Sequence, residues 1–377
     1  MIKIMSQDIK ISFSKELISD DAINEIASSI DVSDDALKFA FFSSNYNKSR
    51  MQNALAKSLG QNVMACSTAG EISPRGITKY TTVAASISSK IAKFKKYEIN
   101  DLIKFNINDA FDIRRDFENE FNFNINDADK YVGILLIDGK SMLEDKIIAL
   151  LYKVFMPIKI VGGSAGDDLH FVQTNVYNDN ELRSNAASFV VLRCETPFRV
   201  FKTQFFKPMS DKIVITDASP RKRIVYEING ERAAVEYASI LNVPVEDLNA
   251  YTFAKHPMVL QIGNNLYVRS FEKMNPDYSL SVLIAIDVGL VLRVAEPTDI
   301  VQDYNNLFEN LKKELGENYF FIAFDCVHRR YLTEQDGLFD QVNNIFKLQN
   351  VIGFNTYGEQ FMGMHTNQTL TGIAFAM

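Results

Sequence analysis

The sequence repeats one order of predicted elements three times, and this repetition constrains the fold more than any other feature. Residues 38–44 (KFAFFSS) are an aromatic-rich run typical of a buried strand. A helix is predicted next, because Met51, Leu55 and Leu59 fall on one face and Gly60 can end it. A second strand (NVMAC), a glycine-containing loop (STAGE) and a third strand (TTVAASI) complete the unit.

The same order returns twice. A second copy starts at 131–138 (YVGILLID) and continues through a helix, the strand IKIV, the loop GGSAGDD and the strand NAASFVVLRC. A third copy starts at 319–325 (YFFIAFD) and continues through a helix, the strand VIGF, the loop NTYGE and the strand NQTLTGIAFA. We therefore expect an α/β fold in which repeated strand–helix–strand units build mixed sheets with packed helices.

The three loops align as a hydroxyl residue, any residue, a glycine and a carboxylate. The aligned residues are Thr68, Gly70 and Glu71, then Ser164, Gly166 and Asp167, then Thr356, Gly358 and Glu359. Each loop could be only a turn, because glycine and small polar residues are ordinary turn formers. Alternatively, the loops lie at the same end of their strands and line a binding crevice together. The threefold recurrence favours the second interpretation.

The last loop begins the richest polar cluster of the chain. Its members are Thr356, Tyr357, Gly358, Glu359, His365 and Asn367. A few convergent polar groups in an apolar setting are typical of small-ligand sites, so this cluster is the predicted ligand pocket, with Glu359 as its charged anchor. The alternative is that Glu359 accepts hydrogen bonds from the backbone amides of its own loop.

Two domains are expected, comprising residues 1–229 and 230–377. The boundary is placed at the Asn229-Gly230 turn signal. In the second domain, residues 300–315 predict a helix that Thr298 or Asp299 caps and Gly316 ends.

Residues 162–166 satisfy the G-x-S-x-G pattern of a serine hydrolase. That motif needs a helix directly after the nucleophile, whereas the following residues (DDLHFVQTNVYND) predict a loop and a strand. We therefore expect no catalytic residue, and a hydrolase using Ser164 is the weakest of the open alternatives. The four histidines lack metal-binding spacing and no CxxC or HExxH occurs, so no metal site is expected.

Charge and composition exclude other classes of function. A net charge of −7 argues against general nucleic-acid binding, which needs a basic surface. The three cysteines, Cys66, Cys194 and Cys326, are too widely spread for a disulfide framework, so a reducing cytoplasm is the expected compartment. The longest apolar runs, 147–161 and 281–295, each carry two charged residues, and no membrane span or signal peptide is expected.

Several segments resemble the FIST family (F-box and intracellular signal transduction). ACSTAGEI, ILLIDG, VGGSAGDD and NAASFVVL are similar to its N domain. EING, AAVEYASIL, FDCVHRR and the pair GFNTYGE and HTNQTLTG are similar to its C domain, and that last pair is the most specific mark.

The resemblance implies a bacterial signal-input protein that binds small molecules, amino acids among them. Such domains are linked to chemoreceptors, histidine kinases or diguanylate cyclases, and some stand-alone members bind haem and sense nitric oxide. No output domain is predicted in this chain, so we expect its signal to pass to a separate partner protein. The leading hypothesis is a cytoplasmic small-ligand sensor that is not an enzyme and needs no cofactor. The alternative is a haem-based nitric oxide sensor that regulates a histidine kinase. In that case a His or Cys side chain would be the axial ligand of the haem iron.

Overall fold

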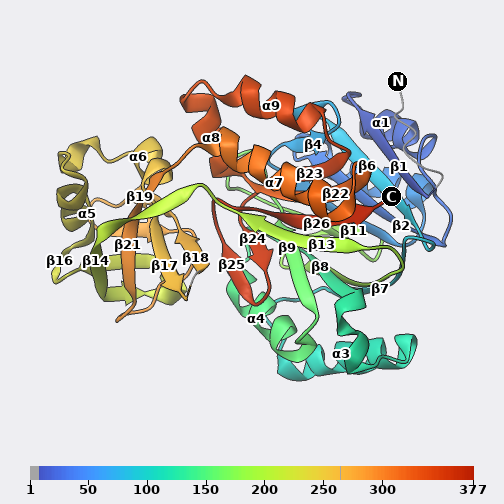
Figure 1. Cartoon of the computed structure of the whole chain (residues 1–377), viewed down its shortest axis with the longest axis horizontal. Coiled ribbons are helices and arrows are strands. Elements are labelled where there is room, and N and C mark those ends of the chain that lie inside the picture. Colours follow the sequence, from blue (N-terminus) through green and yellow to red (C-terminus); the bar gives the residue numbers. More distant parts are fainter. Residues whose placement is uncertain (1–7, 264) are drawn as a thin grey trace.

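The computed structural model describes residues 8–263 and 265–377. These residues form a core of three repeated units and a smaller domain inserted into the third unit (Figure 1). Every unit has the same order: an edge strand, a helix, a central strand, a second helical segment, a second central strand, a hairpin and a last strand.

The first two units are continuous in the chain. The first contains β1 (Ile9–Ser14), α1 (Ser19–Ala27), β2 (Ala36–Ser43), α2 (Lys48–Leu59), β3 (Val63–Thr68), β4 (Glu71–Ser73), β5 (Gly76–Thr78) and β6 (Thr82–Ser88). The second contains β7 (Ala92–Ile99), α3 (Ile107–Phe121), the 3-10 helix η1 (Ile125–Lys130), β8 (Tyr131–Ile137), α4 (Glu144–Phe155), β9 (Lys159–Ser164), β10 (Val176–Asn178), β11 (Glu181–Arg183) and β12 (Ala187–Cys194).

The third unit is interrupted after its edge strand. It contains β13 (Phe198–Thr203), α7 (Ile300–Leu315), β22 (Tyr319–Cys326), α8 (Val327–Gln335), α9 (Phe339–Lys347), β23 (Val351–Thr356), β24 (Glu359–Phe361), β25 (Met364–Thr366) and β26 (Leu370–Ala376). The inserted domain contains β14 (Phe206–Ser219), η2 (Pro220–Lys222), β15 (Ile224–Ile228), β16 (Glu231–Arg232), α5 (Ala233–Leu241), η3 (Val245–Asp247), α6 (Ala250–Lys255), β17 (Met258–Ile262), β18 (Asn265–Arg269), β19 (Phe271–Met274), β20 (Leu280–Val282) and β21 (Val291–Pro297).

The three units build three six-stranded sheets with the same strand order. Each sheet runs from the edge strand to the last strand, then to the two central strands, and ends in a hairpin. The orders are β1-β6-β2-β3-β10-β11, β7-β12-β8-β9-β24-β25 and β13-β26-β22-β23-β4-β5. The two central strands are parallel in every unit, while the other pairs are antiparallel.

The hairpin that completes each sheet comes from a different unit. The β4–β5 hairpin of the first unit pairs with β23, with Ile72 opposite Gly353. The β10–β11 hairpin of the second unit joins the first sheet, and the β24–β25 hairpin of the third unit joins the second sheet. This cyclic exchange interlocks the units, because none of them completes its sheet from its own strands.

The three sheets share one apolar core. Inward side chains from all three pack together, and the rings of Phe41 and Phe354, from the first and third sheets, lie 4.8 Å apart. The outer face of each sheet packs against the helices of its own unit (Figure 1). The central strands are thus buried on both faces, which explains their almost continuous apolar sequences.

The expected fold class is confirmed, including the repeated units and the mixed sheets. The helix predicted at 300–315 is α7, and the Asp299 side chain caps it by accepting a hydrogen bond from the Gln302 amide at 3.0 Å. The Asn229-Gly230 turn joins β15 to β16 inside the inserted domain. The division into 1–229 and 230–377 stays a prediction. In the described part of the chain, no helix has both the length and the apolar character that a membrane span requires.

Candidate functional site

The three predicted loops meet where the parallel central strands end. The amide of Gly166 donates to the carbonyl of Ser67 at 3.0 Å, which joins the second loop to the first. The amide of Ala69 donates to the carbonyl of Asn355 at 3.1 Å, which joins the first loop to the third. The third loop is joined to the second by the amide of Tyr357, which donates to the carbonyl of Ser164 at 3.2 Å. The expectation that these loops share one end of the fold is therefore met.

Glu71 and Glu359 lie in two cages of the same construction. In the first loop, the Thr68 hydroxyl donates to Glu71 at 2.5 Å, and the amide and hydroxyl of Thr81 donate to its second oxygen at 3.2 and 2.6 Å. In the third loop, the Thr356 hydroxyl donates to Glu359, and the amide and hydroxyl of Thr369 donate to it at 3.1 and 2.7 Å. Neither carboxyl is exposed to solvent.

Burial dominates the protonation of these two carboxyls. It raises the pKa of Glu71 to about 7, although the hydrogen bonds from Thr68 and Thr81 act in the opposite direction. Burial likewise raises the pKa of Glu359 to about 8 against the hydrogen bonds from Thr356 and Thr369. Both cages thus hold carboxyls that are partly or mostly protonated near neutral pH.

Asp167 departs from this pattern. It accepts hydrogen bonds from the amides of Phe171, Val172 and Gln173 at 2.7–2.9 Å, and from the Tyr357 hydroxyl. The shorter side chain therefore organises a longer loop between β9 and β10. That loop places the ring of Phe171 against the ring of Tyr357, with their centres 4.6 Å apart.

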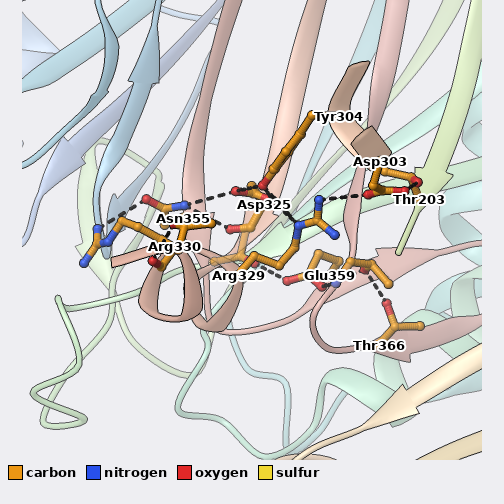
Figure 2. Close-up of polar contacts among 12 residues, drawn as sticks. Thr203, Asp303, Tyr304, Asp325, Arg329, Arg330, Asn355, Glu359 and Thr366 are labelled. Carbon is orange, nitrogen blue, oxygen red and sulfur yellow. Dashed lines mark hydrogen bonds and ion pairs between the residues drawn. The ribbon is translucent and has the colours of Figure 1, made fainter. Parts of the chain in front are cut away.

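Arg330 contacts all three loops, and Figure 2 shows it beside Asn355. Its guanidinium donates to the carbonyl of Ala69 in the first loop, to Asp168 at 3.2 Å beside the second, and to Asn355 at 3.2 Å before the third. Its own side chain is 2% exposed. A planar guanidinium with five donors suits this role, because it bonds in several directions at once.

A second buried network starts at the neighbouring arginine. Arg329 pairs with Asp325 at 2.9 Å and with Asp303 at 3.1 Å, and Tyr304 donates to Asp325 at 3.0 Å (Figure 2). Burial raises the pKa of Asp325 to about 6, and the charge of Arg329 partly offsets this effect. This network joins β22, α7 and α8. The pairing of opposite charges explains how these charged side chains can be buried in the apolar interior.

Most of the predicted site residues are buried in this loop centre. Thr68, Glu71, Ser164, Thr356, Glu359 and Asn367 are each no more than 1% exposed, and Asp167 and His365 are 3% and 2% exposed. Gly70, Gly166 and Gly358 lie so close to Arg330, Ala69 and His365, respectively, that a methyl group at any of these glycines would overlap its neighbour. The loops therefore occupy the space between them. Ligand binding by these residues stays a prediction.

A cavity of about 250 Å³ lies beside this centre, between the core and the inserted domain. Of the predicted site residues, Tyr357 lines it. Its other walls come from the second unit (Lys140, Met142, Glu144 and Phe171), the inserted domain (Lys222, Arg223, Ile224, Glu272, Val282 and Leu283) and the third unit (Cys326, Val327 and His328). Concave sites at domain interfaces with apolar walls and a few polar groups are where small ligands bind.

Among the described residues, some charged side chains of the cavity wall form ion pairs, and others do not. Arg223 of the inserted domain pairs with Glu144 of α4 at 2.7 Å and donates to the carbonyl of Leu283 at 2.7 Å. Lys140 lies over the ring of Phe171, 5.6 Å from its centre. Burial lowers the pKa of His328 to about 4, so its imidazole is neutral at physiological pH.

Sequence reasoning missed the cavity residues other than Tyr357. One signal could have found some of them. The loop alignment makes Ile137 equivalent to Cys326, because these residues pair with Ser164 and Thr356. Gly139 and Lys140 therefore follow the first central strand of the second unit much as Val327 and His328 follow that of the third, and all four residues line the cavity. The residues of the inserted domain had no comparable signal, because no repeat pattern connects them to the loops.

The described side chains can be examined for their ability to hold a metal ion or haem. Within residues 8–263 and 265–377, no group of three or more His, Cys, Asp or Glu side chains is placed to hold a metal ion. Cys326 and His328 are ligand types that haem iron accepts, and both line the cavity. Because a cavity of about 150 Å³ can hold benzene, this one suits roughly ten non-hydrogen atoms, and haem is several times larger. Haem therefore does not fit the cavity as it stands, and haem binding stays a prediction.

Two family models match most of the chain. The FIST N domain matches residues 36–231, and the FIST C domain matches residues 233–362. A search of curated proteins found no match. The two models meet inside the inserted domain, between β16 and α5.

Proposed function

Because the chain belongs to the FIST family, whose domains are associated with signal transduction and small-ligand sensing, we propose that it senses a small molecule in the cavity between core and insert. The observation that carries the proposal is the composition of the cavity wall. Three segments that are distant in the sequence, around Lys140, Val282 and His328, meet there. A ligand in this space would contact both domains at once.

The size and walls of the cavity suit a compact organic molecule. Roughly ten non-hydrogen atoms is the size of a small amino acid. Phe171, Tyr357, Val282 and Val327 supply apolar surface, while Lys140, Lys222 and Glu272 supply charges. Amino acids are therefore the first ligand class to test. Glu359 does not line the cavity, which favours its role in its own loop over a role as ligand anchor.

The signal would leave through a change in the contacts between the two domains. The insert is connected to the core at residues 203–206 and 297–300, where Thr298 donates to the carbonyl of Phe205. Beyond these connections, Arg223 contacts Glu144, and Arg269 donates to the carbonyl of His365 at 3.0 Å. A ligand that favours one arrangement of these contacts shifts the population of that arrangement. A separate signalling protein, such as a histidine kinase, a chemoreceptor or a diguanylate cyclase, would read the change.

Ligand screening tests this function directly. Mass spectrometry of molecules that co-purify, followed by thermal-shift screening of amino acids, is expected to identify a ligand that raises the melting temperature. Phe171→Ala removes one apolar wall and is expected to weaken binding of that ligand by at least about tenfold. The control is Phe111→Ala, which truncates an exposed ring on α3 away from the cavity. Equal affinities in both variants would contradict a site in this cavity.

The haem alternative has its own test. A haem-based nitric oxide sensor would show a Soret absorption band after purification with haem supplied. A spectrum without this band under these conditions would remove the alternative.

A further inference from the structure

Positive and negative charges on the cavity wall are not equal in number, and the charge of the wall affects which ligands the cavity binds. Arg223 and Glu144 neutralise each other at 2.7 Å, and Asp145 lies 3.5 Å from the same guanidinium. His328 is neutral, because burial lowers its pKa to about 4. The remaining charges on the wall are those of Lys140, Lys222 and Glu272.

The two lysines have no carboxylate partner in the described chain. No ion pair joins Lys140 or Lys222 to an acidic side chain anywhere in residues 8–263 and 265–377, and the contact of Lys140 is with the ring of Phe171. Glu272 likewise has no cationic partner among these residues, and Lys140, Lys222 and Glu272 are all solvent-exposed. The lining residues include three cationic side chains (Lys140, Lys222 and Arg223) and two anionic ones (Glu144 and Glu272), so the wall carries one net positive charge.

The start of α8 adds to this positive character. Val327 is the first residue of α8 and lines the cavity together with Cys326 and His328. The Cys326 side chain makes no capping hydrogen bond, and no acidic residue lies in the first turn of α8. The partial positive charge of this helix end is therefore not compensated within its own element. At the start of α4, by contrast, Glu144 and Asp145 already supply negative charge.

We infer that the cavity selects small organic anions and recognises them through their acid group, so that an amino group on the ligand is not required. This inference rests on the proposed function and adds the chemical class of the ligand. Lys140 and Lys222 would bind the carboxylate, and the apolar walls of Phe171, Tyr357 and Val282 would enclose the remainder. Charge-assisted hydrogen bonds from lysine to carboxylate are among the stronger polar contacts available in proteins.

A matched series of probes tests the inference. Benzoate, benzamide and benzamidine have nearly the same shape but carry a negative charge, no charge and a positive charge. We expect benzoate to bind with a Kd of about 1 mM or tighter, which is within reach of a probe of this size, and benzamide to bind at least about tenfold more weakly. Benzamidine binding equal to or tighter than benzoate binding overturns the inference, as does a failure of benzoate to bind.

Variants of the wall separate the acid group from the amino group. Lys140→Met and Lys222→Met each should weaken benzoate binding by about threefold to tenfold, whereas Lys153→Met, on an exposed position of α4 outside the cavity, should leave it unchanged. Glu272→Gln should leave benzoate binding unchanged or tighten it. The opposite expectation holds if the cavity needs an amino group, since Glu272→Gln would then weaken L-leucine binding, and L-leucinamide would bind better than 4-methylpentanoate.

The two levels of the proposal fail differently. If L-leucinamide or benzamidine binds and Phe171→Ala weakens that binding, the cavity is a ligand site but the anion selectivity is wrong. If ligands bind and Phe171→Ala changes none of their affinities, the cavity itself is wrong as the site, and both proposals fall.

Discussion

Glu359 occupies in the third unit the place that Glu71 occupies in the first. Each carboxyl accepts a hydrogen bond from the hydroxyl of the threonine three residues before it. It also accepts hydrogen bonds from the amide and the hydroxyl of the threonine ten residues after it. The first and third loops therefore have the same hydrogen-bonding arrangement. Asp167 of the second unit bonds a different set of donors, and the loop that follows it forms part of the cavity wall.

Truncating Glu359 is expected to reduce stability and to spare ligand binding. Glu359→Ala leaves the Thr369 amide and two hydroxyls without their acceptor, which should lower the free energy of unfolding by about 2–4 kcal/mol. The affinity of the cavity ligand should change less than about threefold, because Glu359 does not line the cavity. Chemical denaturation and calorimetry measure the two quantities, with Glu71→Ala as the matched variant. A large loss of affinity at unchanged stability would return Glu359 to the ligand site.

Stability should fall as the pH rises through neutrality. The folded state raises the pKa of Glu71 to about 7 and of Glu359 to about 8, so the folded protein binds more protons than the unfolded chain between about pH 4.5 and these values. The stabilisation is complete below the unfolded pKa and is lost as the pH rises through the folded pKa. The double variant Glu71→Gln and Glu359→Gln keeps neutral groups in both cages. Its unfolding free energy should therefore fall less between pH 5 and 8 than that of the wild type, and parallel pH profiles would contradict these shifts.

Arg330 is expected to be essential for the loop centre. Arg330→Met keeps an apolar stem of similar length but removes the donors to Ala69, Asn355 and Asp168. We expect a loss of about 2–4 kcal/mol in the free energy of unfolding, because the buried acceptors on Ala69 and Asn355 lose their donor. The partly exposed carboxylate of Asp168 keeps its ion pair with Lys79 at 3.8 Å. Arg115→Met is the control, since its ion pair with Asp112 is mostly exposed and should contribute less than about 1 kcal/mol. Equal losses in the two variants would argue against the central role of Arg330.

Gly70 is expected to tolerate no side chain. Its φ is +137°, and a methyl group there would overlap the guanidinium of Arg330 and the side chain of Asn355. Gly70→Ala should therefore cost more than the roughly 1 kcal/mol that positive φ alone costs an alanine. Gly289→Ala isolates that conformational part, because Gly289 has a φ of +85° and open space around it. The melting temperature of the first variant should be clearly below that of the second.

Ser164 is not expected to act as a nucleophile. It is fully buried, its hydroxyl accepts a hydrogen bond from Gln360 at 2.9 Å, and a loop follows it where a hydrolase has a helix. A fluorophosphonate probe should not label the native protein at this residue, and Ser164→Ala should leave ester turnover at background. Labelling of Ser164 in the folded protein would show that the motif is a hydrolase site.

Much of the fold could be predicted because its signals are local. The alternation and apolar runs of the central strands, the amphipathic face of α2 and the capped helix α7 each depend on residues within a few positions of one another. The repeated spacing of a hydroxyl residue, a glycine and a carboxylate also predicted that the loops are equivalent. Sequence patterns predicted the last strand, β26, but not the β24–β25 hairpin before it. They also did not connect β13 to α7 as parts of one unit, because the inserted domain separates them.

The sequence by itself determined the two central strands of each unit, the helical segment between them, the last strand and the kind of residue in each loop. It did not indicate that an edge strand, a first helix and a hairpin also belong to every unit. Only the tertiary structure decided that each hairpin completes the sheet of another unit, and that the loops fill their own centre while the cavity opens beside it. The physical reason is that strand edges present the same amide and carbonyl groups whichever unit they belong to, so pairing depends on which edges the packed core brings together. The cavity likewise exists only where Lys140, Val282 and His328 meet, and no local pattern along the chain connects these three residues.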